Sequence, residues 1–179
     1  NMIGIFSFFA GAGFLDLGFE MTYHFETLFV NEFKQSFNDI YQFSRRNMVI
    51  AAPQFGHHVG DISQWLNNEQ WNAELHGYIN QARQREDIDM VGFIGGPPCP
   101  DFSVAGKNKG REGDNGRLSQ TYVDLICNSL PDFFVFENVK GLYRTARHRA
   151  FFEELKQQLT LAGYAMTEQL INSIEFGAP

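Results

Sequence analysis

Cysteine is scarce in this chain. Its 179 residues include two cysteines, Cys99 and Cys127, which lie in unlike contexts and lack the spacing of metal ligands. So few cysteines exclude a disulfide framework and indicate a reducing compartment, which we expect to be the cytoplasm. We therefore expect neither a structural disulfide nor a bound metal.

Long hydrophobic runs are absent as well. The apolar runs are short, interrupted by glycine and separated by charged stretches, so we expect no secretory signal and no membrane span. A length of 179 residues with 44% hydrophobic residues allows one substantial core and falls short of two complete domains. The prediction is one soluble α/β domain over residues 2–179, with Asn1 an addition before the natural start at Met2.

Cations are also few. Lys and Arg number 14 against 21 Asp and Glu, and the net charge of −7 argues against a nucleic-acid-binding surface spread over the whole chain. Two local clusters answer that objection. The glycine-rich stretch 103–117, which we expect to be a mobile loop, contains Lys107, Lys109, Arg111 and Arg117. The second cluster consists of Lys140, Arg144, Arg147 and Arg149.

What the chain does contain is an alternation of strand and helix patterns. Strands are predicted at residues 3–9, 27–30, 90–94, 133–136 and 167–174. Helices are predicted at residues 14–24, 34–43, 63–83, 121–128 and 150–162. This alternation indicates a doubly wound, mostly parallel sheet that binds its ligands at the carboxyl ends of the strands.

One cysteine follows directly after a predicted strand. A glycine pair and a proline pair end the apolar run 90–94, and we expect them to project Cys99 into the crevice at the strand's carboxyl end. A thiol in that place is suited to nucleophilic chemistry. Cys127, which lies in an apolar helical stretch, is instead predicted to be a small core residue.

A glycine-rich turn, Phe9-Ala-Gly-Ala-Gly13, closes the first predicted strand. Such a turn lets a ligand approach backbone amides, and a plain turn is the alternative. A dinucleotide site would have a third glycine at position 16, where this chain has Asp16. The pattern therefore favours a nucleoside-type cofactor over NAD.

Two acidic residues follow predicted strand ends or turns. Glu32 can accept hydrogen bonds from both hydroxyls of a ribose, or it can serve as a first-turn acid of the helix 34–43. Asp61 can accept from an adenine amino group, or Asp61 or Ser63 can cap the next helix. Both residues therefore have a ligand-binding and a structural interpretation.

Glu137 ends the entirely apolar strand 133–136. Desolvation there should raise the pKa of its carboxyl group, which could then share a proton with a substrate nitrogen. A salt-bridged structural acid is the alternative. Because neighbouring strands would bring Cys99 and Glu137 to one crevice, we favour a catalytic role for the pair.

Taken together, the motifs resemble those of the DNA (cytosine-5) methyltransferases in order and spacing, from Ile3 to Pro179. They are Phe9-Ala-Gly-Ala-Gly13, Glu32, Gly60-Asp61, Pro97-Pro-Cys-Pro-Asp-Phe-Ser103, Gly116-Arg-Leu118 and Glu137-Asn-Val139. The resemblance implies a Rossmann-like fold of the S-adenosylmethionine-dependent methyltransferase type, with that cofactor as methyl donor and S-adenosylhomocysteine as product. It also implies double-stranded DNA as substrate, with the target cytosine flipped out, and a bacterial or phage gene, with or without a restriction partner.

The resemblance assigns roles to individual residues. The Cys99 thiolate adds to carbon 6 of cytosine while Glu137 hydrogen-bonds or protonates N3, which activates carbon 5 for methylation. The implied cofactor-binding residues are Phe9, Ala10, Gly11, Gly13, Glu32, Phe33, Asp61, Ile62, Pro98 and Leu118. The implied substrate-binding residues are Ser103, Lys107, Lys109, Asn138 and Val139, and the loop 103–117 would close over the base.

Some positions depart from the family pattern. Pro100 stands where Gln is common, and Asn115 stands where an Arg often precedes the glycine. The segment 172–179 resembles the start of a family segment whose base-contacting arginine would lie beyond Pro179. We therefore expect an N-terminal part of a longer or split enzyme, without its target-recognition domain, that alone binds cofactor weakly and exposes an apolar seam.

Two other functions remain open from the sequence. The family includes a tRNA-methylating branch with the same catalytic motifs, so an RNA cytosine-5 methyltransferase is one alternative. A non-catalytic S-adenosylmethionine-binding module is the other, although it would not need Cys99 and Glu137 together. His57 and His58 are expected to lie in a solvated loop rather than to act as a base.

Overall fold

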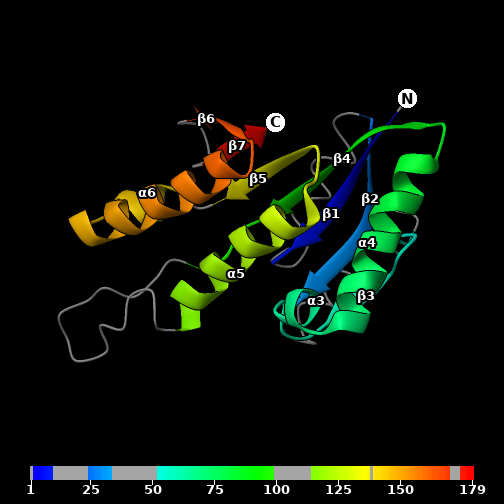
Figure 1. Cartoon of the computed structure of the whole chain (residues 1–179), viewed down its shortest axis with the longest axis horizontal. Coiled ribbons are helices and arrows are strands. Elements are labelled where there is room, and N and C mark those ends of the chain that lie inside the picture. The colour runs from blue at the N-terminus through cyan, green and yellow to red at the C-terminus, as the bar shows by residue number, and fades with distance from the viewer. Residues whose placement is uncertain (1, 10–23, 34–51, 99–113, 138, 170–173) are drawn as a thin grey trace. The chain divides into compact units, whose positions relative to one another are not determined.

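The computed structural model describes residues 2–9, 24–33, 52–98, 114–137, 139–169 and 174–179 (Figure 1). The chain forms two compact units, Asn1–Gly95 and Gly96–Pro179. Residues 34–43, which are predicted to be a helix, lie outside the described residues. So do residues 14–23 of the helix predicted over 14–24. Among the described residues, no helix is long and apolar enough to cross a membrane.

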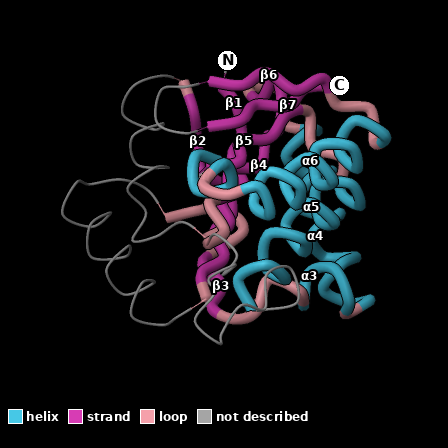
Figure 2. Tube along the Cα trace, turned by 90° about the vertical axis from the view of Figure 1, so that its left-hand side faces the viewer, coloured by secondary structure: helices cyan, strands magenta, loops and turns pink. Residues whose placement is uncertain are grey.

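The first unit is built on four parallel strands in the order β3-β2-β1-β4. They are β1 (Met2–Phe8), β2 (Phe25–Glu32), β3 (His57–Val59) and β4 (Ile88–Gly95). The strands predicted at 3–9, 27–30 and 90–94 are confirmed, because continuous apolar runs are buried on both faces of a parallel sheet. The helices α3 (Gln64–Asn67) and α4 (Glu69–Gln84) follow β3, and α4 runs beside the strands (Figures 1 and 2).

The histidine pair belongs to the sheet, so the expectation of a solvated loop is wrong. His58 stacks on Phe29, with ring centroids 4.9 Å apart, and its Nε2 lies 2.8 Å from the carbonyl oxygen of Phe55. Because a carbonyl oxygen only accepts, we assign the proton to Nε2. The pairing of β3 with β2 joins residues distant in the chain, which a local pattern of three residues does not reveal.

The single helix predicted over 63–83 is two helices in the structure, separated at Asn68. Asn68 has an extended backbone, and its side chain accepts from the backbone N–H groups of Gln70 (3.0 Å) and Trp71 (3.2 Å). An asparagine side chain competes with the helix for these donors, so it ends α3 and caps α4. The break is so short that the helical spacing of apolar residues continues across it in the sequence, which is why one helix was predicted.

The second unit contains an antiparallel sheet in the order β5-β7-β6. Its strands are β5 (Phe133–Glu137), β6 (Ala165–Gln169) and β7 (Ile174–Ala178). The single strand predicted over 167–174 is therefore wrong, because β6 and β7 are two strands that pair antiparallel with each other and the sequence pattern does not mark where the first one ends. Gly177 lies directly against the Phe134 ring, where an added Cβ atom would overlap it.

Two helices of the second unit are longer than predicted, and a third, short 3-10 helix was not predicted. They are α5 (Asp114–Ser129), the 3-10 helix η2 (Val139–Tyr143) and α6 (Ala146–Leu161). Because α5 begins at Asp114, the last four residues of the expected loop 103–117 are helical, and the rest lie outside the described residues. Thr145 caps α6 by accepting from the His148 N–H at 3.2 Å.

Polar side chains join α5 to α6. Asp124 Oδ1 accepts from Gln158 Nε2 at 2.6 Å and from Gln120 Nε2 at 2.9 Å. Cys127 lies half-buried on α5, where burial raises the pKa of its thiol. A protonated, half-buried thiol is consistent with the predicted structural role.

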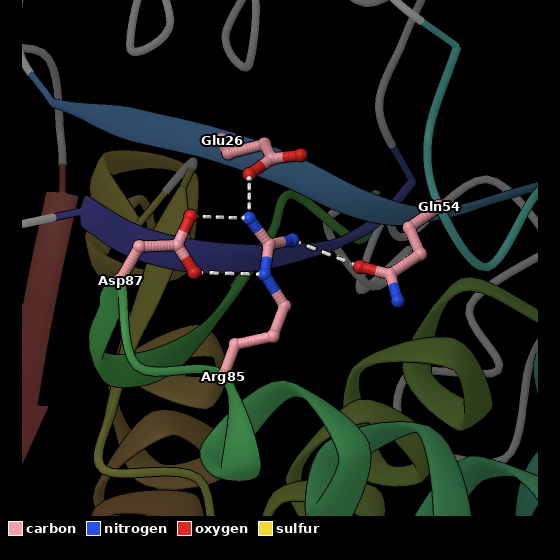
Figure 3. Close-up of polar contacts among 4 residues, drawn as sticks. All are labelled: Glu26, Gln54, Arg85 and Asp87. Atoms are coloured by element: carbon pink, nitrogen blue, oxygen red, sulfur yellow. Dashed lines mark hydrogen bonds and ion pairs between the residues drawn. The ribbon is translucent and has the colours of Figure 1, made fainter.

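A second polar cluster lies at the amino-terminal ends of β2 and β4 in the first unit. The Arg85 guanidinium donates to Glu26 Oε2 at 2.9 Å, to both carboxyl oxygens of Asp87 at 2.9 and 2.7 Å, and to Gln54 Oε1 at 2.8 Å (Figure 3). These charge-assisted bonds tie the end of α4 to β2. The cluster stabilises the fold at the end of the strands opposite to Glu32.

Candidate functional site

Glu32 is the last residue of β2 and is 1% exposed. Among the described residues, neither of its carboxyl oxygens has a hydrogen-bond partner. Burial raises the pKa of this carboxyl group to about 7. An acid buried without donors is unfavourable for folding, so its presence at a strand end indicates a group kept for a ligand.

The chemistry of Glu32 fits the ribose of a nucleoside cofactor. A ribose presents two neighbouring hydroxyl donors, and an ionised carboxylate presents two acceptor oxygens. The alternative role, as an acid in the first turn of a helix over 34–43, lies outside the described residues. The orphaned carboxyl group is the observation that supports the ligand-binding interpretation.

Two neighbours of Glu32 are described at the same end of the strands. Phe33 directly follows Glu32 and is 54% exposed, as an aromatic side chain free to stack on a ligand would be. Phe9 follows β1 with a positive φ of 57°, and its backbone N–H donates to the Asn31 carbonyl oxygen at 3.2 Å. Phe9 thus opens the glycine turn while remaining tied to β2.

Asp61 has a structural partner. Its Oδ1 accepts from the Ser63 N–H at 2.9 Å, while the Ser63 side chain makes no capping bond to α3. Asp61 therefore closes a turn just before α3, and neither the Asp61 nor the Ser63 side chain caps the helix itself. The Asp61 carboxyl group remains exposed, so it can also accept from a ligand, whereas the neighbouring Ile62 is 1% exposed and belongs to the core.

In the second unit, Glu137 ends β5 and is half-buried. Burial raises the pKa of its carboxyl group, as the apolar strand predicts. Among the described residues, no cation pairs with Glu137, so the salt-bridge alternative gains no support. A carboxyl group with a raised pKa holds its proton to a higher pH than an exposed glutamate does.

Gly96 lies against the Glu137 carboxyl group. A Cβ atom at residue 96 would lie 2.9 Å from Glu137 Oε2 and 3.2 Å from Glu137 Cβ. Only glycine leaves room for this carboxyl group. The segment that leads to Cys99 therefore runs beside Glu137, and the Pro98 carbonyl oxygen accepts from Ser119 Oγ on α5 at 3.4 Å.

The structure describes some of the other predicted site residues, and the rest lie outside the described residues. Pro98 and Leu118, the latter on α5, are half-buried, and Val139 lies in η2. Outside the described residues lie Ala10, Gly11, Gly13, Cys99, Ser103, Lys107, Lys109 and Asn138. In the part of the chain that is described, no three His, Cys, Asp or Glu side chains are grouped as metal ligands.

Comparison with known proteins identifies the family of this chain. The sequence profile of the C-5 cytosine-specific DNA methylase family matches residues 3–179. The chain belongs to this family. Type II methyltransferase M.NmeDI of Neisseria meningitidis serogroup C is 58% identical over 175 residues, which are 98% of this chain and 41% of that protein.

A more distant relative matches over a similar share of this chain and of its own length. Type II methyltransferase M.FnuDI of Fusobacterium nucleatum is 29% identical over 173 residues, 97% of this chain and 42% of its own length. The chain thus spans about two-fifths of the length of these two relatives. The family assignment rests on nearly the whole chain.

Solved structures share the fold. The S. pombe Dnmt2 methyltransferase matches with a TM-score of 0.63 and 14% identity, over 99% of this chain and 49% of that one. A Spodoptera frugiperda DNMT2 mutant matches with a TM-score of 0.55 and 14% identity, over 92% and 43%. The fold is that of the S-adenosylmethionine-dependent methyltransferases, as predicted.

Two residues of the site were not singled out from the sequence. Gly96 was treated as a strand breaker, and its contact with Glu137 depends on a residue 41 positions away. Asn31, the residue directly before Glu32, received no role from the sequence. A buried amide directly before a strand-end acid was the available signal, since buried amides need specific partners.

Proposed function

We propose that this chain provides the catalytic and cofactor-binding part of an enzyme that methylates carbon 5 of cytosine in double-stranded DNA. S-adenosylmethionine supplies the methyl group, and Cys99 and Glu137 carry out the chemistry on the base. The observation that carries the proposal is Gly96, three residues before Cys99, lying against the Glu137 carboxyl group. That contact brings the backbone leading to the nucleophile beside the acid.

The proposed reaction is balanced on the cytosine ring. The Cys99 thiolate forms a bond to carbon 6, while the protonated Glu137 carboxyl group donates its hydrogen to N3, so that the electron pair reaches carbon 5. Carbon 5 then takes the methyl group. A base removes the carbon 5 proton, and the electron pair of that C–H bond expels the Cys99 thiolate as the proton returns from N3 to Glu137.

This chain also supplies groups that bind the cofactor. Glu32 would accept from the ribose hydroxyls, Asp61 from the adenine amino group, and Phe33 would stack on the ring. Phe9, Ala10, Gly11 and Gly13 would turn the chain closely around the ligand, with Ile62, Pro98 and Leu118 as apolar neighbours. The orphaned Glu32 carboxyl group supports this assignment.

The substrate-binding residues are proposed on the family pattern. Ser103, Lys107 and Lys109 would contact the DNA backbone around the flipped base, and Asn138 and Val139 would flank Glu137. Because the matched relatives are longer than this chain, we propose that further polypeptide, in the same or a second chain, supplies target recognition. We place the enzyme in the bacterial cytoplasm, as part of a restriction-modification system.

A covalent trap tests the proposal. The full-length gene product is incubated with S-adenosylmethionine and DNA that contains 5-fluorocytosine, in which fluorine replaces the proton that must leave. Since the last step is then blocked, the protein should remain attached to the base. The adduct should be lost in Cys99→Ala and retained in Cys127→Ala, a matched control that removes the other cysteine.

The outcomes separate the alternatives. An adduct that survives in Cys99→Ala would contradict the assigned nucleophile. No adduct with DNA but one with 5-fluorocytosine-containing tRNA would favour the RNA enzyme. Cofactor binding with no adduct on either nucleic acid, tested with a library of DNA sequences, would leave the non-catalytic module as the function.

A further inference from the structure

We propose that Asn31 is the positioning residue of the cofactor site, because its side-chain amide ties β2 to α3 and to the loop that carries Asp61, while its backbone carbonyl oxygen binds Phe9 at the start of the glycine turn. The inference rests on the proposed binding of S-adenosylmethionine by this unit. Asn31 is 3% exposed and precedes Glu32 on β2. It is not assigned a contact with the cofactor itself.

The side chain of Asn31 has two partners of opposite polarity. Trp65 Nε1 on α3 donates to Asn31 Oδ1 at 2.9 Å, and Asn31 Nδ2 donates to the Gly60 carbonyl oxygen at 3.3 Å. An indole N–H only donates and a carbonyl oxygen only accepts. The orientation of the amide is therefore determined by its neighbours.

Neither an acid nor an apolar residue satisfies both partners. Aspartate could accept from Trp65, but it would present an oxygen to the Gly60 carbonyl oxygen. Leucine would leave the indole N–H and the Gly60 carbonyl oxygen unpaired. A buried polar group without a partner lowers stability, so asparagine is the residue that this position requires.

The backbone around Asn31 connects the same elements. The Asn31 carbonyl oxygen accepts from the Phe9 N–H at 3.2 Å, and the Glu32 carbonyl oxygen accepts from the Gly60 N–H at 2.8 Å. Asn31 and Glu32 together thus hold the start of the glycine turn and the loop that carries Asp61 against the end of β2. The spacing between the proposed ribose and adenine acceptors depends on this bridge.

The test measures affinity and recognition of the adenine separately. Binding of S-adenosylhomocysteine is compared with S-inosylhomocysteine, in which an oxygen replaces the amino group that Asp61 would contact. In the full-length protein, Asn31→Asp should weaken binding of S-adenosylhomocysteine by about tenfold or more, because it breaks the Gly60 bond. It should also shrink the preference for the adenosyl compound to about twofold.

A matched control uses another asparagine of the same unit. Asn72 Nδ2 donates to the Trp65 carbonyl oxygen at 2.8 Å, so Asn72→Asp also removes an amide donor from a backbone carbonyl. Asn72 lies on α4 and holds Trp65 by its backbone carbonyl oxygen, whereas Asn31 is bound by the indole N–H of Trp65. Both variants should unfold at a lower temperature than wild type, and only Asn31→Asp should change affinity and preference.

A milder variant guards against loss of folding. Trp65→Phe keeps an aromatic ring at this buried position and removes the donor to Asn31 together with part of the indole volume, and it should weaken S-adenosylhomocysteine binding by about two- to threefold. Equal affinity changes in Asn31→Asp and Asn72→Asp, or unchanged affinity and preference in Asn31→Asp, would overturn the positioning role. If Asn31→Asp fails to fold, unchanged affinity in Trp65→Phe would overturn it as well. Failure of the wild-type protein to bind S-adenosylhomocysteine would instead overturn the proposed function.

Discussion

Glu26 and Glu32 lie near opposite ends of β2 and have opposite environments. Glu26 is half-exposed and receives a hydrogen bond from Arg85, within a cluster in which the guanidinium also binds Asp87 and Gln54 (Figure 3). Glu32 is buried, and no described residue donates to it. Two identical side chains, six residues apart on one strand, therefore serve different purposes.

The difference separates a stabilising acid from a functional one. The Glu26 side chain is paired with Arg85 and partly exposed, so it contributes modestly to stability. Among the described residues, the Glu32 carboxyl group at the carboxyl end of the sheet has no donor, at a cost in stability that a ligand would offset. In parallel sheets, ligands bind at the carboxyl ends of the strands, which is where the unpaired acid lies.

The largest expected effect comes from removing the unpaired acid. Glu32→Gln should weaken S-adenosylmethionine binding by roughly 30- to 100-fold, because charge-assisted bonds to the ribose would be lost. Its unfolding temperature should not fall, since the variant buries no ionisable group. Calorimetric titration checks the affinity, with Glu26→Gln as the matched control whose affinity should equal that of wild type. Equal affinity in Glu32→Gln and wild type would contradict the assigned role.

A change in pH should produce an effect of about tenfold. The pKa of Glu32 is raised to about 7, and the ribose hydroxyls would bind the ionised form, so affinity should rise about tenfold from pH 6 to pH 8. Stability should show the opposite trend. The raised pKa favours the protonated folded state, and this contribution is complete below the unfolded pKa and is lost as pH rises through about 7.

The Glu32→Gln variant provides the control for this pH dependence. Its cofactor affinity should be flat between pH 6 and pH 8, because the titrating group has been removed. Titrations at several pH values, with buffers of equal ionic strength, provide the measurement. A wild-type affinity that falls with rising pH over this range would show that the protonated form binds.

A third glutamate, Glu137, also ends a strand. Gly96→Ala would place a methyl group against the Glu137 carboxyl group and should lower kcat about tenfold, with little change in KM for the cofactor. The pH profile of kcat should shift, since Glu137 would move. Gly77→Ala is the matched control, because a Cβ atom there meets nothing within 4 Å. Equal kcat values in the two variants would argue against a role for Gly96 in placing the acid.

The smallest effect is expected at the paired end of β2. Arg85→Gln should lower the unfolding midpoint by about 3 °C, because its ion pairs are partly exposed and therefore weak. Cofactor affinity should not change, since the cluster lies at the far ends of the strands from Glu32. Thermal unfolding with and without S-adenosylhomocysteine measures both quantities. A large loss of affinity would mean that the two ends of the sheet are coupled.

Much of the fold could be predicted from local patterns. The apolar runs that became β1, β2, β4 and β5 are continuous, and burial on both faces of a sheet requires such runs. The histidine strand and the hairpin of β6 and β7 could not be predicted in this way. A strand of three residues has no period to detect, and an antiparallel reversal without a glycine or proline leaves the alternation intact.

In the candidate site, too, some features follow from local sequence patterns and others depend on distant partners. Glu137 was predicted to have a raised pKa because the strand before it is wholly apolar, and the structure agrees. Asp61 had two interpretations, and only the geometry revealed its bond to Ser63. The sequence could not show that Asn31 meets Trp65 and Gly60, because those partners lie 34 and 29 residues away.

By itself, the sequence determined which residues are chemically suited to the reaction and the family to which the chain belongs. Residue type, order and spacing carry that information because side-chain chemistry does not depend on the fold. Only the tertiary structure decided which acids have partners. Whether Glu26 is paired and Glu32 is not depends on the distances and burial that folding creates between segments far apart in the chain, and so does the fit of Gly96 against Glu137.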